Sequence, residues 1–190
     1  MLAPLFERLP GFELITDPDP NGKPNPLRTY LECLRRTPEC ATHRLILQDD
    51  CWPCRDFRAK AEAALDERPE SIVLFFVPGS SGGGMNSVIR AAKAGERWAL
   101  IGAGAWVPVV ASCWPVSLIP DFLEFANQRR FARLRSDDEL VKRFVGARRL
   151  SVWATVPSLV EHPDTVPSLI GRRHGAGSIK WRVAAMFDEG

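Results

Sequence analysis

Short apolar segments alternate with segments of helical periodicity along most of this chain, and that alternation restricts its fold more than any other feature. The continuous apolar run 71–77 is typical of a strand that is buried on both faces. Elsewhere apolar residues recur every three or four positions, as Leu27, Tyr30 and Leu34 do, which is the spacing of one helix face. The pattern predicts a single α/β domain over residues 1–190, with a mixed, mostly parallel sheet flanked by helices.

The individual elements can be predicted from periodicity and from their boundary residues. Strands are predicted at 12–15, 44–47, 71–77, 98–101, 107–111 and 150–154. Helices are predicted from Pro26 onward and at 57–65, 87–94 and 120–128. A last helix is predicted behind Ser136-Asp-Asp-Glu139, because Ser-x-x-Glu matches a capping box.

The composition is that of an ordinary globular protein and excludes several classes. The chain has 190 residues, of which 45% are hydrophobic and 25% charged, enough for one core. The longest apolar stretch, 98–120, is interrupted by two glycines and two prolines, so no membrane span is expected. Five cysteines are too few, and odd in number, for a disulfide framework. We expect a soluble, cytoplasmic protein.

Charge is distributed unevenly along the chain. Residues 1–126 carry a net charge of −3 and residues 127–190 carry +5. The excess forms a basic stripe made of Arg129, Arg130, Arg133, Arg135, Lys142, Arg143, Arg148 and Arg149. Such a stripe favours an anionic partner, such as a nucleotide, a nucleic acid or a phosphorylated glycan. Equally, it can be a solvated helix face that keeps the protein in solution.

Two adjacent acids, Asp49 and Asp50, follow the predicted strand 44–47 and Gln48. In open α/β sheets the functional groups lie at the carboxyl ends of strands. Neighbouring carboxylates repel one another there, and Mg²⁺ or Mn²⁺, which prefer oxygen ligands, would offset that repulsion. The alternative is that both acids cap the N-terminus of the next helix.

The pair Cys51-Trp-Pro-Cys54 lies directly after these acids. A C-x-x-C sequence between a strand and a helix is the place of a thioredoxin-type redox pair. Together with Cys33 and Cys40 it would give a spacing that fits no standard zinc site. The preceding acids oppose thiolate formation, which favours buried cysteines without a redox role.

The segment Val156-Pro-Ser-Leu-Val-Glu-His162 follows the last predicted strand and ends in a histidine. Histidine in an irregular segment after a core strand is a candidate metal ligand. A single histidine is more often an ordinary hydrogen-bonding residue.

Together these features resemble the small GT-A-type glycosyltransferases found in phage and bacterial genomes. The resemblance covers roughly residues 12–170 and is most specific at Gln48–Asp50 and at Pro157–His162. It implies a GT-A-like, Rossmann-like fold, a nucleotide-sugar donor, expected to be UDP-linked, and a divalent metal, Mn²⁺ or Mg²⁺.

The resemblance also implies roles for particular residues. Asp50, together with Asp49, corresponds to the D-x-D element that binds metal and diphosphate, and His162 to a late histidine that completes the metal shell. Asp138, and after it Asp137, corresponds to the acid presented to the acceptor, which would take the hydroxyl proton. Both acids also suit the first turn of a capped helix.

Further residues are expected to bind the donor. Arg172 or Arg173 would stabilise the negative charge that develops on the leaving diphosphate. Asp17, at the end of the first predicted strand, would contact the base or the ribose. A retaining mechanism remains open, because the sequence does not place the acceptor.

The acceptor is expected to carry a hydroxyl group, and several classes are open. A hydroxymethylated base in phage DNA would use both a metal site and the basic stripe, and would place the enzyme in the host cytoplasm; a surface glycan or a protein is the alternative. Two other functions compete with the glycosyltransferase. One is a thioredoxin-like thiol-disulfide oxidoreductase that uses Cys51 and Cys54, and the other is a nucleic-acid-binding module that uses residues 129–149.

Overall fold

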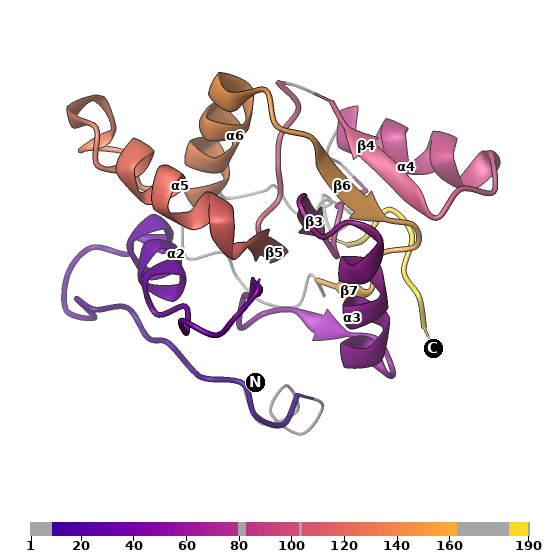
Figure 1. The fold of residues 1–190 in the computed structure, drawn as a ribbon, viewed down its shortest axis with the longest axis horizontal. Helices are drawn as coiled ribbons and strands as arrows, with labels where there is room; N and C mark the ends of the chain where they lie inside the picture. The colour runs from indigo at the N-terminus through magenta and orange to yellow at the C-terminus, as the bar shows by residue number, and fades with distance from the viewer. Residues whose placement is uncertain (1–8, 80–82, 103, 163–182, 190) are drawn as a thin grey trace, which may run out of the picture.

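A five-stranded sheet packed between helices organises the computed structural model of the chain (Figure 1). The structure describes residues 9–79, 83–102, 104–162 and 183–189. The strands are β1 (His43–Leu47), β2 (Trp52–Pro53), β3 (Ile72–Leu74), β4 (Trp98–Ile101), β5 (Ala111–Pro115), β6 (Val152–Thr155) and β7 (Val160–Glu161). The helices are α2 (Pro26–Arg35), α3 (Phe57–Glu67), α4 (Gly83–Lys93), α5 (Ile119–Ala126) and α6 (Asp137–Arg148), with 3-10 turns η1 (Val116–Leu118) and η2 (Arg129–Phe131).

The strand order of the main sheet is β1-β5-β3-β6-β4. Only β3 and β6 pair in parallel, whereas β1 with β5, β3 with β5 and β4 with β6 are antiparallel. The expected α/β architecture and the mixed sheet are therefore confirmed, but the expectation of a mostly parallel sheet is wrong. The reason is that β4 and β5 run opposite to the other three strands. No helix lies among the described residues between β4 and β5, and β5 inserts between β1 and β3.

The core has two parts, one on each face of the sheet. Helix α3 covers one face, where Phe57, Ala61 and Ala64 pack with Val73 and Cys113. On the other face α2, α5 and α6 gather around β5, and α4 lies beside β4 (Figure 1). The second part is rich in aromatic rings, and the Trp114 ring lies 4.7 Å from Phe122 between centroids. Burying one such side chain contributes roughly 1.5–3 kcal/mol.

Two predicted strands are absent from the structure. Residues 12–15 have no strand structure, and β5 starts at Ala111, where the predicted strand 107–111 ends. Serine, cysteine and proline give β5 a weak strand signal, but every residue of it is buried. Burial of Ser112 is possible because Tyr30 Oη and Ser112 Oγ are 2.9 Å apart and share a hydrogen bond.

The helix boundaries agree better with the predictions. Pro26 occupies the first turn of α2, and the Asn25 side chain accepts a hydrogen bond from the Arg28 backbone N–H. The predicted capping box of α6 forms, because Ser136 Oγ accepts the Glu139 N–H at 3.2 Å. No helix among the described residues is long and apolar enough to cross a membrane.

The carboxyl ends of β1, β3 and β6 lie at one edge of the sheet, because these three strands run in the same direction. Backbone hydrogen bonds tie the segments that leave this edge to one another. The Gln48 N–H donates to Val110 O at 2.8 Å, and the Val160 N–H donates to Phe75 O at 3.0 Å. The segments Gln48–Asp50 and 156–162, far apart in the sequence, leave the sheet at this edge and meet there through Asp50 and His162.

A candidate active site at the carboxyl edge

Asp50 and His162 are in direct contact at this edge. His162 Nε2 lies 2.9 Å from Asp50 Oδ2, and the two side chains are 2% and 19% exposed. The His162 ring also lies against the buried Phe76 ring, with 5.9 Å between centroids. Two of the three side chains proposed from the sequence as metal ligands are thus brought together by the fold.

A small second sheet accounts for this contact. Strands β2 and β7 pair antiparallel, with Trp52 opposite Glu161. The Cys54 N–H extends the pairing by donating to Leu159 O at 2.9 Å. In this register the residue after Glu161 falls beside the residues just before Trp52, which sets His162 next to Asp50.

Asp137 is buried at the N-terminus of α6 and joins this helix to the end of β1. Its Oδ2 accepts a hydrogen bond from Gln48 Nε2 at 3.3 Å, and its Oδ1 accepts the Asp138 N–H at 3.0 Å. Burial raises the pKa of the Asp137 carboxyl, whereas these hydrogen bonds lower it. Gln48, which the sequence analysis treated only as part of a motif, is therefore a structural link between the two acidic pairs.

Asp138 is half-buried beside Asp137, and its carboxylate accepts two hydrogen bonds from the segment before β5. Oδ1 accepts the Val109 backbone N–H at 2.9 Å, and the Trp106 side chain donates to the same carboxylate. Burial, and after it the negative charge of Asp137, raises the pKa of Asp138 to about 7. A carboxyl group with that pKa can accept a proton near neutral pH.

The remaining predicted residues are placed as follows. Asp49 is exposed at the turn after β1, so its carboxylate is open to a ligand from solvent. Asp17 does not end a strand, and its Oδ2 accepts a hydrogen bond from Arg28 Nη2 at 2.7 Å. This hydrogen bond lowers the pKa of Asp17. Arg172 and Arg173 lie outside the described residues, and their role stays a prediction.

The side chains at this edge supply part of the ligands that a divalent cation needs. A carboxylate oxygen and an imidazole nitrogen at one point are ligands that Mn²⁺ accepts. In the described part of the chain no group of three or more His, Cys, Asp or Glu side chains could hold a metal ion. A cation held by Asp50 and His162 would therefore take further ligands from water or from substrate phosphates, as Mg²⁺ and Mn²⁺ commonly do.

The cysteines differ from those of a thiol-disulfide oxidoreductase. Cys51 and Cys54 are both buried and both free. Burial, followed by the charges of Asp50 and Asp49, raises the pKa of the Cys51 thiol, and burial also raises the pKa of Cys54. A redox pair needs an accessible thiol of low pKa, so this environment opposes the thioredoxin-like alternative.

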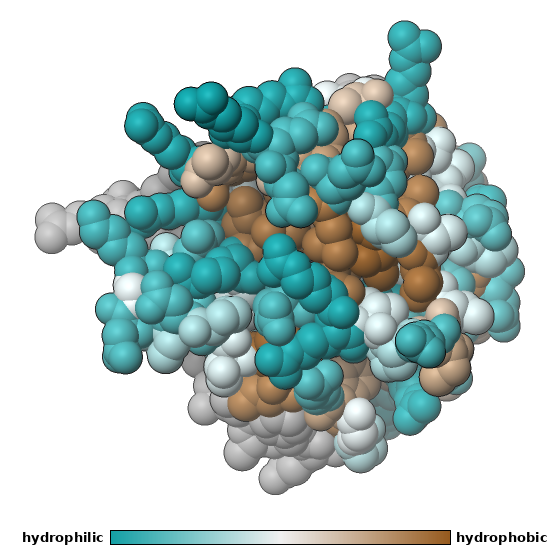
Figure 2. Space-filling view, turned by 60° about the vertical axis from the view of Figure 1, so that its left-hand side comes forward, coloured by the Kyte–Doolittle hydropathy of each residue, from teal (hydrophilic) through white to brown (hydrophobic). Residues whose placement is uncertain are grey.

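The basic stripe is partly neutralised by the protein itself. Arg148 Nη2 lies 2.6 Å from Asp121 Oδ1, and Arg143 Nε lies 2.8 Å from Glu139 Oε1. The Arg130 guanidinium lies over the Phe131 ring at 4.7 Å. Figure 2 shows this side of the molecule, where hydrophilic side chains surround a band of apolar surface. At these three positions the stripe covers aromatic rings of the core while its charges stay in contact with solvent.

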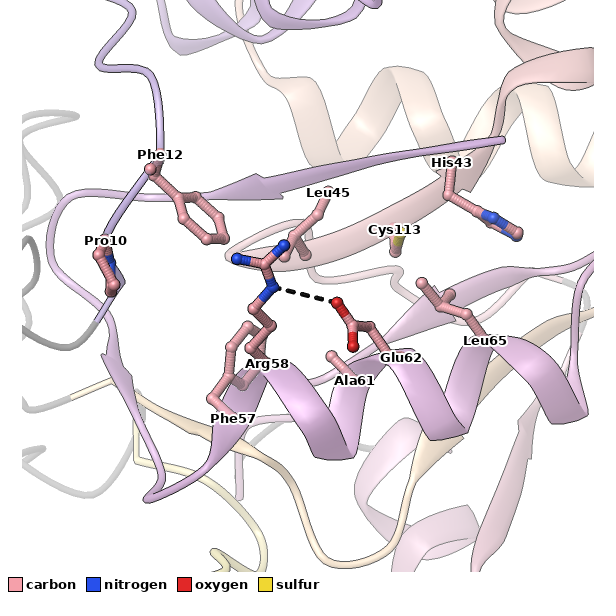
Figure 3. A pocket seen from close by; sticks show the side chains of 11 residues that line it. Pro10, Phe12, His43, Leu45, Phe57, Arg58, Ala61, Glu62, Leu65 and Cys113 are labelled. Atoms are coloured by element: carbon pink, nitrogen blue, oxygen red, sulfur yellow. Dashed lines mark hydrogen bonds and ion pairs between the residues drawn. The ribbon is translucent and has the colours of Figure 1, made fainter. Parts of the chain in front are cut away.

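A hollow of about 320 Å³ lies on the α3 side of the sheet, and none of the acidic site residues lines it (Figure 3). Apolar side chains such as Phe12, Leu45 and Leu65 make up most of its wall. An exposed ion pair, Arg58 Nε to Glu62 Oε1 at 3.0 Å, stands at one side. His43 and Cys113 also line the hollow, so titratable groups are present there, but its wall is mainly apolar.

Compared with known proteins, the chain matches no family model and no curated protein. The expected glycosyltransferase function therefore stays a prediction, which depends on the residues and the geometry of this edge.

Proposed function

We propose that the chain is a nucleotide-sugar-dependent, metal-dependent glycosyltransferase of GT-A type that transfers a sugar to a hydroxyl acceptor. The single observation that carries the proposal is the contact between Asp50 and His162 at the same sheet edge as Asp138. Such a transfer requires one group that holds a cation and another that accepts a proton. The carboxylate–imidazole pair suits the first role, and the half-buried acid with a pKa near 7 suits the second.

Asp50 and His162 would hold the cation, and Asp49, exposed beside them, would contact the metal-bound diphosphate. When bound, the cation supplies positive charge that stabilises the diphosphate leaving group. Arg172 or Arg173 is proposed to add to that charge, and Asp17 is proposed to contact the donor's base or ribose.

Asp138 is proposed as the general base, with Asp137 as the second choice. The acceptor hydroxyl oxygen forms a bond to the anomeric carbon while the bond from that carbon to the diphosphate oxygen breaks. The electron pair of the broken bond leaves with the diphosphate, and the hydroxyl proton passes to the Asp138 carboxylate. Gln48 holds Asp137 through its side-chain amide, so the buried acid next to the base stays fixed.

The donor half of the proposal can be tested by calorimetry with UDP and Mn²⁺. Asp50→Asn removes the charge but preserves the shape, and we expect binding to weaken about a hundredfold, which corresponds to ~2.7 kcal/mol. His162→Ala should also weaken binding, because one ligand is lost, while the fold remains intact. Asp66→Asn, an exposed acid in α3, serves as the matched control.

Two results would contradict the proposal. One is Mn²⁺-dependent nucleotide binding that survives Asp49→Asn and Asp50→Asn together. The other is a disulfide exchange activity that Cys51→Ser or Cys54→Ser abolishes and that a chelator leaves unchanged. The second result would restore the oxidoreductase alternative.

A further inference from the structure

Trp106 is an exposed tryptophan whose side chain is fixed beside the proposed base. Its exposure is 37%, so a large part of the indole is open to a ligand from solvent. The residue lies in the segment that joins β4 to β5, between Gly104, with a φ of +83°, and Val107 and Val109, which are buried. The buried valines anchor the segment, while the indole stays at the surface.

The Trp106 indole is oriented by the Asp138 carboxylate. Its N–H donates to that carboxylate, which also accepts the backbone N–H of Val109 at 2.9 Å. A tryptophan that needed only a hydrogen-bond partner could use water at the surface. Here the polar edge of the ring is bound to the acid, and the rest of the ring keeps an apolar surface beside it.

The charged residue in contact with this ring is Asp138, and Asp137 lies next to it. Asp49, Asp137 and Asp138 form no ion pair with an arginine or lysine among the described residues. Bringing a phosphate backbone next to such carboxylates would cost electrostatic energy, because like charges repel. In contrast, the negatively polarised face of an indole attracts the C–H groups of a neutral sugar ring.

We infer that the acceptor is a neutral sugar whose ring stacks on Trp106, so that its attacking hydroxyl reaches Asp138. This inference rests on the proposed glycosyltransferase function and specifies its acceptor. It favours a glycan over the DNA base considered from the sequence. Trp106 is then a residue that binds substrate and, through its indole N–H, also sets the proton affinity of the base.

The test uses the full chain with Mn²⁺, a set of UDP-sugars as donors, and neutral 4-nitrophenyl pyranosides as acceptors. Trp106→Leu removes the stacking surface, and we expect the acceptor KM to rise at least tenfold with unchanged donor affinity. Trp106→Phe keeps a ring but loses the N–H, so the KM should rise less. The pH midpoint of the rate should move to higher pH in this variant, because a hydrogen bond that stabilises the carboxylate is lost.

Trp98→Phe is the matched control. Its indole N–H also donates to a carboxylate, Glu67 Oε2 at 2.7 Å, which lies at the end of α3. This variant should leave both the acceptor KM and the pH midpoint unchanged. If losing an indole–carboxylate hydrogen bond simply destabilised the fold, the effect would appear equally in Trp98→Phe and Trp106→Phe.

The outcomes separate the two proposals. If the wild-type chain binds no UDP-sugar with Mn²⁺, the proposed function fails. If it binds the donor but Trp106→Leu has the wild-type acceptor KM, the assignment of Trp106 is overturned. Two results would overturn the inference that the acceptor is a neutral sugar. One is sugar transfer to a duplex containing 5-hydroxymethylcytosine and to none of the pyranosides. The other is donor binding without transfer to any pyranoside.

Discussion

The two charged regions of this chain differ in how the protein partners their charges. At the carboxyl edge of the sheet, Asp137 is buried and receives a hydrogen bond from Gln48, and Asp138 receives one from Val109, so both acids bond to residues far away in the sequence. In the basic stripe, Arg143 pairs with Glu139 on its own helix and Arg148 pairs with Asp121 on α5, and both arginines remain about half exposed.

This difference shows which charges can take part in chemistry. Burial changes the pKa of an acid and fixes its position, as it does for Asp138, at a cost to stability. An exposed arginine keeps its charge and is screened by salt, so it affects solubility or weak association more than reactivity. The sequence shows equally strong charge clusters in both regions, and only burial distinguishes them.

The largest expected effect is on the rate of sugar transfer when the proposed base loses its charge. Asp138→Asn should lower kcat by about 10²–10⁴-fold, the usual contribution of a general base, without weakening UDP binding. In the wild type the rate should fall as pH drops below about 7, because Asp138 then becomes protonated. Steady-state kinetics from pH 5 to 9 would measure both effects.

The control for this variant is Glu139→Gln, which lies in the same first turn of α6 and pairs with the exposed Arg143. It should keep the wild-type rate and pH profile. A rate for Asp138→Asn within twofold of the wild type would remove this residue from the chemistry and return it to the role of a helix-end acid.

A smaller effect, of opposite sign, is expected on folding stability. In the folded state the pKa of Asp138 is raised from the ordinary value of 3.8 to about 7. Between these two pH values the folded state still holds a proton that the unfolded state has already released. Wild-type stability should therefore fall as pH rises from about 4 to about 7. Asp138→Asn avoids this loss and should be more stable than the wild type by about 1–3 kcal/mol at pH 8, less than the full shift because the side chain is only half-buried.

Urea unfolding at pH 5 and at pH 8 would measure this difference. The stabilisation should be larger at pH 8 than at pH 5, where the wild-type acid is already mostly neutral. An equal effect at both pH values would indicate that the substitution acts through packing, and that the acid is not held in an unfavourable site.

The smallest effect is expected in the basic stripe. Arg148→Ala breaks the ion pair with Asp121, in which the two side chains are 42% and 41% exposed. We expect this variant to lower the free energy of unfolding by less than about 1 kcal/mol. A double-mutant cycle with Asp121→Ala, measured by urea unfolding at low and high salt, would isolate the pair. A coupling energy above about 2 kcal/mol that persists in 1 M salt would contradict the contrast between the two regions.

Part of this site was expected before the structure was known. The resemblance implied that Asp50 and His162 belong to one site, and they touch, because β1 and β6 end at the same edge of the sheet. The capping box of α6 is local and was predicted correctly, including the acids that follow Ser136. Gln48 and Trp106 had no such signal, because their roles depend on side-chain contacts with Asp137 and Asp138.

The sequence by itself determined the elements whose signals are local. Periodicity defined α2 and α3, cap residues defined the start of α6, and a short apolar run defined β4. These features depend on interactions within a few residues, so they can be read from the order of the amino acids.

Only the tertiary structure decided the direction of β5 and the pairing of the acids. The insertion of Ala111–Pro115 between β1 and β3, together with the antiparallel pairing of β4 with β6, makes the sheet mixed. Burial of Ser112 there depends on Tyr30 from α2. Likewise the pKa of Asp138 is set by burial, by Asp137 and by the segment before β5, which meet only after folding. Desolvation and long-range hydrogen bonds depend on which surfaces pack together, and the local sequence does not contain that information.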